Sequence, residues 1–300
     1  MIRQLHIIIP YYNGQAFIEA CLASIRIAAR DVTYKIILVN NSIEKCMVEA
    51  STDLIIIETK KGIGFGRACN IGVYKNLDAD YFMIINQDAL IDAAGIQEFL
   101  KLHKKLRQDD VLLSPFLKNY HFTKPNHIFN NLTINRISGL KMDLVNSELR
   151  ASYEINFASG ACLFFSKHFI ERFSLFDPSF FMYGEDDDLC HRVLKAGSKI
   201  ILASHAIVGH DSGFEQSTES VILLRRIYKR NANVLLRLKH PEQYLNSAFA
   251  YRTKSLLKAL LAMNFNALTA YMKFDKNRKV LNLKQLKPEI KKQIEKDLIS

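Results

Sequence analysis

The chain has 300 residues, and 49% hydrophobic residues are enough for a substantial core, which excludes an intrinsically disordered protein. Its net charge of +11 is unevenly placed, because residues 221–300 hold 18 Lys/Arg against 5 Asp/Glu and the remainder is slightly acidic. Five scattered cysteines without a C-x-x-C pair argue against a disulfide framework and a zinc site, and predict a reducing, cytoplasmic location.

The N-terminal "MIRQLHIIIPYYNG" offers a short apolar strand and then a proline, which is too brief for a signal peptide. No uninterrupted apolar stretch reaches the ~18 residues that a membrane span needs, so we expect any membrane contact to be peripheral, on the inner face of the cytoplasmic membrane. The tail stretch "SLLKALLAMNFNALTAYMKF" fits an amphipathic helix on an anionic membrane, or a helix packed on the protein with a solvated basic face.

Four short apolar runs rich in Ile and Val come first in the chain: "LHIIIP", "YKIILVNNS", "DLIIIETK" and "DYFMIINQD". Continuous hydrophobicity is typical of strands buried on both faces of a parallel sheet. Helical patterns over residues 16–29, 66–75 and 94–107 lie between or after them. This alternation predicts an α/β doubly wound unit whose strand-end loops converge on one ligand site.

Residues 111–154 are less regular, and we expect a flap that faces the second substrate, with a strand pair within "HIFNNLTINRISGLKMDLV". A buried strand "GACLFFS", a helix over residues 167–173, an acidic helix start and a last strand "KIILAS" follow. The composition then becomes basic and helical. We therefore expect an α/β domain over residues 1–220 and a basic helical region over 221–300.

The glycine-rich stretch "KGIGFGRACNIG" does not complete the dinucleotide pattern G-x-G-x-x-G, because Arg67 stands at the third glycine position. Gly62, Gly64 and Gly66 still allow close approach of the backbone to a ligand at a helix start, with Arg67 available to an anion. An ordinary glycine turn is the alternative.

Two separated residues are candidate metal ligands. Asp88, at the end of the fourth strand in "INQD", can hold a divalent cation that neutralises a diphosphate, although a cap or turn is the common role of such a residue. His210 in "SHAIVGHDSG" would suit Mn²⁺ somewhat better than Mg²⁺ beside a carboxylate, and a surface histidine is its alternative. His205 is the rival position.

The stretch "FFMYGEDDDLCHRVLKAG" crowds four carboxylates, Glu185 to Asp188, at the start of a predicted helix that Gly197 ends. Acidic residues are favourable in a first helical turn, because they face the positive end of the helix dipole. A solvated helix start is therefore sufficient to explain this stretch when it is considered alone.

Seven segments, however, resemble the inverting family-2 glycosyltransferases in order and spacing: "IIIPYYNG", "ILVNNS", "KGIGFGRACNIG", "INQDALID", "SGACLFFS", "FDPSFFMYGEDDDLCHR" and the histidine of "VGHDSG". The chain is most similar to the bacterial rhamnosyltransferase-like branch that assembles cell-surface polysaccharides, over roughly residues 5–215. The resemblance implies a GT-A fold and sugar transfer from a nucleotide-diphosphate donor, dTDP-rhamnose or a UDP-hexose, to a hydroxyl of a glycan or lipid-linked acceptor.

The same resemblance implies a set of donor-binding residues: Pro10, Tyr12, Asn13, Asn40, Gly64, Arg67, Asn70 and Asn86. Asn40 replaces an aspartate that contacts the pyrimidine in the family, and an amide can still accept that hydrogen bond. Asn86 replaces the first Asp of the family's D-x-D motif. Asp88 and His210 are the implied ligands of Mn²⁺ or Mg²⁺, and the lost charge predicts weak or dispensable metal use.

By resemblance, Asp186 is the catalytic base, the second acidic residue of E-D-x-D. Inversion requires one carboxylate that takes the proton of the acceptor hydroxyl as its oxygen attacks from the face opposite the diphosphate. Crowding and burial raise the pKa of a carboxylate, whereas a helix N-terminus lowers it. We expect Glu185 to orient the acceptor, and Asp187 and Asp188 to cap the helix.

Two other functions fit parts of the sequence. The basic tail is compatible with a nucleic-acid-binding protein, but no reader motif is present. A sugar nucleotidyltransferase also has an α/β nucleotide domain, but it carries a Gly-rich, Arg/Lys-bearing signature after the first strand, where this chain has "PYYNGQAF".

Overall fold

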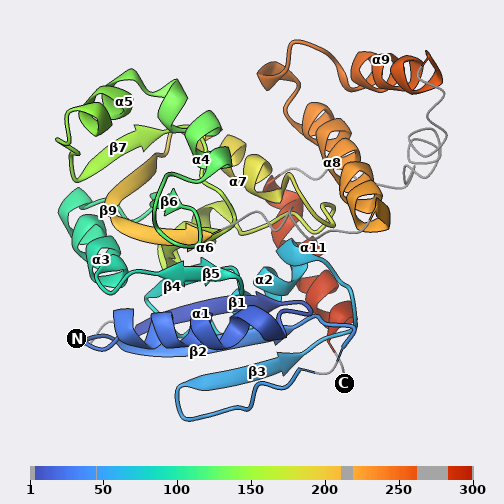
Figure 1. Ribbon diagram of the computed structural model, residues 1–300. Coiled ribbons are helices and arrows are strands. Elements are labelled where there is room, and N and C mark those ends of the chain that lie inside the picture. The colour runs from blue at the N-terminus through green and yellow to red at the C-terminus, as the bar shows by residue number, and fades with distance from the viewer. Residues whose placement is uncertain (1–3, 45, 211–218, 262–282, 299–300) are drawn as a thin grey trace.

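The computed structural model describes residues 4–44, 46–210, 219–261 and 283–298 (Figure 1). Within them, one 9-stranded mixed sheet has the order β3-β2-β1-β4-β8-β6-β9-β5, with β7 paired to β9. The strands are β1 Gln4–Tyr11, β2 Thr33–Asn40, β3 Leu54–Glu58, β4 Tyr81–Ile85, β5 Ala89–Ile91, β6 Leu112–Lys118, β7 Ser152–Ile155, β8 Cys162–Ser166 and β9 Ile200–His210.

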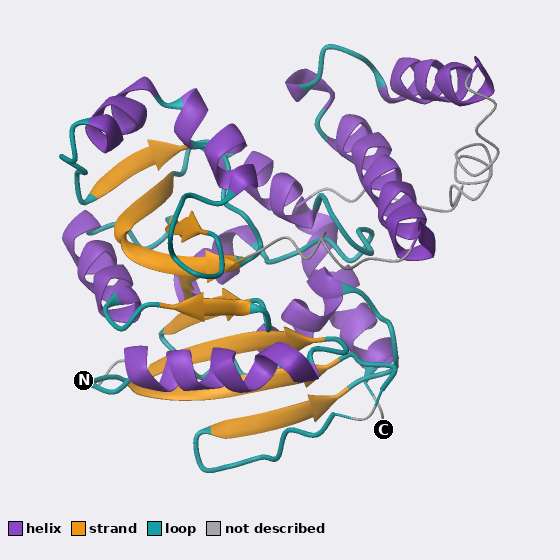
Figure 2. Ribbon diagram, in the orientation of Figure 1, coloured by secondary structure: helices purple, strands orange, loops and turns teal. Residues whose placement is uncertain are grey.

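Most helices lie around this sheet, whereas α8 and α9 lie to one side of it (Figure 1). They are α1 Gln15–Ala28, α2 Phe65–Tyr74, α3 Gly95–Leu106, α4 His127–Leu132, α5 Ser138–Val145, α6 Lys167–Phe173, α7 Glu185–Lys195, α8 Glu219–Lys239, α9 Ala248–Leu261 and α11 Leu283–Asp297. Figure 2 shows the strands as a continuous layer with α1 across the front. The helices expected over 16–29, 66–75, 94–107 and 167–173 are confirmed to within about one residue.

The first half of the sheet is parallel, as the continuous apolar runs predicted. β1 pairs in parallel with both β2 and β4, and β2 with β3. All residues of β4 are buried, because α-helices cover both faces of a parallel sheet. Their carboxyl ends therefore meet at one edge.

The second half returns to the same edge through two antiparallel steps. β8 runs antiparallel to β4 and to β6, so β6 and its parallel partner β9 have the direction of β4. The end of β9 consequently reaches the edge where β4 ends. The short strand β5 lies antiparallel to β9 and places Ala89 opposite His210.

The strand pair expected within residues 127–145 is wrong, because helices α4 and α5 occupy this segment. The Asn126 side chain caps α4 by accepting hydrogen bonds from the N–H groups of Ile128 and Phe129. The last strand is also longer than "KIILAS", since β9 continues to His210.

The C-terminal region contacts the α/β unit at two places. The end of α8 packs on the start of α7, and α11 packs on α2 with Leu286, Ile290 and Ile294 buried in the main core. The boundary near Ser220 stays a prediction, but α11 shares the hydrophobic core of the preceding unit. Among the described helices, none is long and apolar enough to cross a membrane.

Candidate active site

Four strand-end loops contact one another at the carboxyl edge of the sheet. The Tyr12 N–H donates to Gln87 Oε1, and Gln87 Nε2 donates to the Tyr12 carbonyl, at 2.8 Å each. The Asn41 side chain accepts a hydrogen bond from the Ile63 N–H at 2.6 Å, and the Asn13 N–H donates to Ser42 at 2.8 Å. The structure thus brings together the polar segments that were expected to converge.

The three predicted donor residues at the end of β1 and in the loop after it occupy different environments. Pro10 is buried at the end of the strand, whereas Tyr12 is 42% exposed. Asn13 adopts a left-handed φ of 48°, and its side-chain oxygen accepts from the N–H groups of Ile43 and Glu44. Asn13 therefore ties the loop after β1 to the loop after β2 and leaves Tyr12 open to a ligand.

Asn40 is buried and its amide is used at both ends. Its Nδ2 donates to both carboxylate oxygens of Glu58, at 3.1 and 2.8 Å, and its Oδ1 accepts from the Ser42 N–H. An amide oxygen can accept two hydrogen bonds, so one lone pair of Oδ1 is left for a base. Its expected contact with a pyrimidine stays a prediction.

The predicted donor residues of α2 brace the segment that precedes α7. The Arg67 Nε donates to the Pro178 carbonyl at 2.9 Å, and the Asn70 amide both donates to and accepts from the Phe176 backbone. A Cβ on Gly64 would lie 2.2 Å from the Phe181 carbonyl oxygen. These contacts hold α2 against residues 176–181. For Asn70, the sequence had indicated only ligand binding.

Asn86, Asp88 and His210 lie side by side where β4 and β9 end. The His210 Nε2 is 3.4 Å from Asp88 Oδ1 and 3.3 Å from Asn86 Nδ2. The Asn86 Oδ1 is buried without a hydrogen-bond partner. Since β5 sets Ala89 opposite His210, the register itself places Asp88 beside this histidine.

These residues fit a divalent cation as a partial ligand set. No group of three or more His, Cys, Asp or Glu side chains able to hold a metal occurs in the described part of the chain. A cation here would therefore take the Asp88 carboxylate, the His210 imidazole and the unpartnered Asn86 oxygen, with the remaining positions left to water or phosphate. A carboxylate together with an imidazole suits Mn²⁺.

The segment 159–161 links this group to Asp186. The Asn86 N–H donates to the Ala161 carbonyl at 2.9 Å, and the Gly160 N–H donates to Asp186 Oδ2 at 3.0 Å. The other Asp186 oxygen accepts from the Asp187 N–H at 3.0 Å. The candidate base and the candidate metal ligands thus flank one short piece of chain.

The crowded carboxylates differ in their readiness to ionise. Burial raises the pKa of Glu185 well above its ordinary value, and the neighbouring Asp186 charge adds to the effect. Burial also raises the pKa of Asp186, against the two backbone N–H groups that stabilise its ionised form. Burial and the Asp186 charge raise the pKa of Asp187 to about 7. A neutral Glu185 removes much of the repulsion that four adjacent acids would create.

Glu185 faces the interior. It is 6% exposed, its Oε2 has no partner, and its Cγ would lie 3.5 Å from a Cβ on Gly66 in α2. The expectation that Glu185 orients the acceptor stays a prediction. The buried position of Glu185 favours its neutral form, which adds no negative charge next to Asp186.

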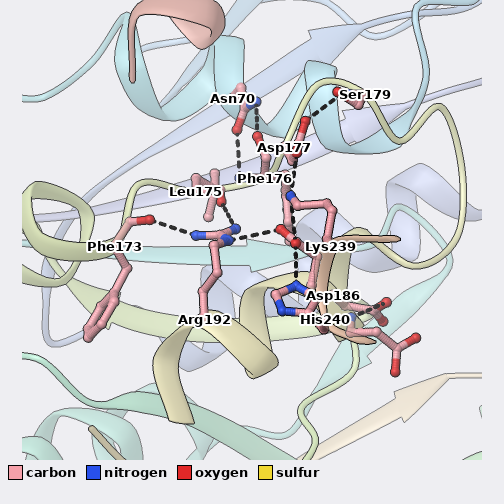
Figure 3. Close-up of polar contacts among 12 residues, drawn as sticks. Asn70, Phe173, Leu175, Phe176, Asp177, Ser179, Asp186, Arg192, Lys239 and His240 are labelled. Carbon is pink, nitrogen blue, oxygen red and sulfur yellow. Dashed lines mark hydrogen bonds and ion pairs between the residues drawn. The ribbon is translucent and has the colours of Figure 1, made fainter. Parts of the chain in front are cut away.

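The expected capping role of Asp188 is wrong, because this side chain belongs to a buried ion network (Figure 3). Burial opposes its ionisation, but Arg192, His240 and Lys239 outweigh that effect and hold its pKa far below the ordinary value. Asp187 does not cap the helix either, since the side chain that accepts a hydrogen bond from an N–H group of this turn is Asp186, at the Asp187 N–H.

A small pocket adjoins His210 on the side of α4. It is lined by Ser114, Leu117, Asn126, Ile128, Phe129, Thr133, Phe157, Ser159 and His210. Since Ser159 belongs to segment 159–161, this pocket lies beside the piece of chain that holds Asp186.

The sequence did not point to Gln87, Asn41 or Gly160 individually, although each lies inside or beside a quoted motif. It assigned no role to Lys239 or His240, whose buried contacts are with residues more than fifty positions away. Burial of a lysine was the reverse of what the basic composition of this region predicted.

Comparisons with known proteins agree with this geometry. The sequence model of the family described as "Glycosyl transferase family 2" matches residues 6–173. Rhamnosyltransferase WbbL of Escherichia coli K12 is 24% identical over 221 residues, which are 68% of this chain and 82% of WbbL. The low-salt glycan biosynthesis hexosyltransferase Agl10 of Haloferax volcanii is 24% identical over 67% of this chain and 64% of its own length.

Two solved structures share the fold. The crystal structure of GalNAc-T7 with UDP, GalNAc and Mn²⁺ superposes with a TM-score of 0.54 at 10% identity, over 87% of this chain and 58% of that one. TarS 1–349 of S. aureus in complex with UDP gives 0.50 at 12% identity, over 92% of this chain and 82% of that one. The chain thus has a GT-A-like fold.

Proposed function

Because the chain belongs to glycosyl transferase family 2, we propose that it transfers a sugar from a nucleoside diphosphate donor to a hydroxyl of a glycan or lipid-linked acceptor, with inversion. The observation that carries this proposal is the partly buried Asp186, which segment 159–161 connects to Asn86, Asp88 and His210. Because the chain belongs to this family, we do not propose the two other functions, nucleic-acid binding and sugar nucleotidyl transfer.

In the proposed reaction, Asp186 accepts the proton of the acceptor hydroxyl. The acceptor oxygen then forms its bond to the anomeric carbon while the bond from that carbon to the diphosphate breaks on the opposite face. The raised pKa of Asp186 makes it a stronger base than an ordinary aspartate. The Gly160 N–H keeps the carboxylate aimed, because it holds one of its oxygens.

A divalent cation bound by Asp88 and His210 would neutralise charge on the leaving diphosphate. We expect the Asp88→Asn and His210→Ala variants to need at least tenfold more Mn²⁺ for half-maximal activity than the wild-type enzyme. Titration of activity with Mn²⁺ measures this, and a His205→Ala variant, at an exposed position, is the control. Full wild-type activity in excess chelator would contradict the metal assignment.

The donor is proposed to be dTDP-rhamnose or a UDP-hexose. The names of the sequence relatives support a rhamnosyl or hexosyl group, and the UDP in both structural neighbours supports a pyrimidine nucleotide. The name of Agl10, a glycan biosynthesis hexosyltransferase, supports a role in glycan synthesis, and the glycan is proposed to be one of the cell surface.

We expect Asp186→Asn to lower the transfer rate by about 100-fold to 10,000-fold, because general base catalysis contributes that much. Nucleotide binding should persist, since the Asp186 carboxylate bonds to the N–H groups of Gly160 and Asp187 and not to the loops after β1 and β2. Release of the nucleoside diphosphate and a thermal shift with UDP measure the two effects. Asp31→Asn, at an exposed position, is the matched control. An active Asp186→Asn enzyme would remove the base assignment.

The protein is further proposed to act at the cytoplasmic membrane face, where a lipid-linked acceptor would lie. Leu245, just before α9, and Phe249 and Leu257 on α9 are exposed by 106%, 79% and 55%, and the exposed Arg252 and Lys254 lie between the last two in the chain. No Asp or Glu occurs from residue 243 to 274. Apolar side chains among cations suit an anionic lipid surface. Residues 262–274 of the expected amphipathic stretch lie outside the described residues.

A further inference from the structure

A buried ion network joins the end of α8 to the first turn of α7 (Figure 3). Asp188 Oδ1 accepts from Lys239 Nζ at 2.7 Å and from His240 Nε2 at 2.9 Å, and its Oδ2 accepts from Arg192 Nε at 2.8 Å. Lys239 also bonds the Asp177 carboxylate. The first turn of α7 is therefore fixed both by Arg192 of the same helix and by Lys239 and His240 of the C-terminal region.

The network is closed to solvent and balanced in charge. Asp177 and Asp188 have no exposed side-chain surface, and Lys239 has 3%. Two carboxylates face the two cations Arg192 and Lys239, and His240 adds a hydrogen bond through Nε2 while its Nδ1 is buried without a partner. Buried ion pairs often add little net stability compared with apolar packing, but in some proteins they select one geometry, and loss of one partner is strongly destabilising.

The network also fixes the chain that leads into α7. Arg192 donates to the carbonyl groups of Phe173 and Leu175, and Asp177 accepts from the Ser179 N–H at 2.7 Å. Phe180 then packs with Ala232, Leu235 and Leu236 of α8. Both the entry to α7 and its first turn therefore depend on contacts with α8.

Asp186 stands on that turn, two residues before Asp188. Residues two apart on an α-helix point in directions about 200° apart, so Asp188 is anchored inward while Asp186 faces segment 159–161. A small rotation of the turn displaces the Asp186 carboxylate directly. A misplacement of ~1 Å in a catalytic group can cost about 100-fold in rate.

We propose that Lys239 and His240 are positioning residues, which hold the first turn of α7 so that Asp186 meets the acceptor hydroxyl. The proposal rests on the proposed function of Asp186 as the base. It makes the C-terminal region part of the catalytic apparatus, although none of its residues need touch the reacting atoms.

The test measures release of nucleoside diphosphate with water as acceptor, on the first donor that the wild-type enzyme cleaves among dTDP-rhamnose, UDP-galactose and UDP-glucose. Lys239→Met and His240→Phe should each lower kcat by about 10-fold to 100-fold. The KM for the donor should stay within about threefold. Lys195→Met is the matched control, because it removes an exposed ion pair between α7 and Glu242 and should leave kcat unchanged.

A stability effect is separated from positioning by the charge-balanced variant Asp177→Asn/Lys239→Met. It removes one charge of each sign, so its melting temperature should return toward that of the wild type. The kcat should stay low, because this variant lacks the ion pair between Lys239 and Asp188. Recovery of kcat together with the melting temperature, or wild-type kcat in Lys239→Met, would overturn the proposal. No cleavage of any donor by the wild-type enzyme would instead contradict the proposed function.

Discussion

The ionised carboxylate of Asp187 destabilises the folded protein, and it lies in the same turn of α7 as the proposed base Asp186. This carboxylate sits beside Asp186 in a partly buried position, and Arg136 compensates only in part for burial and repulsion. A raised pKa means that the folded protein binds this proton more tightly than the unfolded chain does. The acid turn is therefore a source of instability at neutral pH, which a surface helix start would not be.

We expect Asp187→Asn to stabilise the protein at pH 8 by about 1–2 kcal/mol, a range that allows for solvent screening. Between the ordinary pKa of an aspartate and about 7, the folded wild type holds more protons than the unfolded chain, so its stability falls as pH rises through that window. The advantage of the variant should disappear near pH 4. Melting at pH 4, 6 and 8 measures it, and an advantage independent of pH would contradict this explanation.

At the scale of elements, two loops meet so closely that only glycine fits between them. Gly64, the residue before α2, has φ 99° and ψ 160°, a region that side chains avoid. It lies against the Phe181 carbonyl, just before α7. The donor-side helix and the helix that carries Asp186 are thus held in contact through backbone atoms.

Gly64→Ala should destabilise the protein by about 3 kcal/mol or more, because backbone strain and a clash with a carbonyl add together. Gly197→Ala is the matched control, since Gly197 has φ 73° but nothing within 4 Å of a built Cβ. It should cost only about 1 kcal/mol, from the left-handed conformation. Urea unfolding of both variants measures the difference, and equal losses would show that the clash is relieved.

The elements that the sequence predicted well are those whose own residues determine them. The runs that became β1 to β4 and the patterns that became α1, α2 and α3 carry their periodicity locally. Residues 127–145 were mispredicted. The buried residues Phe129, Ile134 and Leu140 lie on separate short helices, and each helix is too short for its apolar residues to show a helical rather than a strand periodicity. The strand-end loops were correctly grouped, since parallel strands must end together.

At the scale of the whole molecule, the C-terminal region was the hardest part to predict. The sequence predicted only a basic helical region over residues 221–300, and in the structure α11 contributes Leu286, Ile290 and Ile294 to the main core. The Asp297 carbonyl accepts from the Lys60 N–H, and Leu298 bridges to Thr59, so this helix braces the loop before Gly64. Pairings over such distances along the chain depend on tertiary packing, which no local pattern encodes.

Helix α9 lies to one side of the sheet (Figure 1) and exposes the apolar side chains Phe249 and Leu257, and α8 also exposes Val221, Leu224 and Leu238. We expect wild-type protein to pellet with vesicles of phosphatidylglycerol and phosphatidylcholine, but weakly with phosphatidylcholine alone, because Arg252 and Lys254 favour an anionic surface. Binding should weaken at high salt.

Phe249→Ser/Leu257→Ser should reduce vesicle binding by about 10-fold to 100-fold, since each apolar side chain contributes up to about 1.5–3 kcal/mol on full burial. Ile27→Ser/Phe17→Ser is the matched control, because these side chains on α1 are exposed by 55% and 45% and lie outside the C-terminal region. The control should bind as the wild type does. If both double variants bind equally well, the contact is electrostatic or lies elsewhere, and α9 is not the docking helix. Loss of binding in the first pair alone would identify α9 as the element that brings Asp186 to a membrane-bound acceptor.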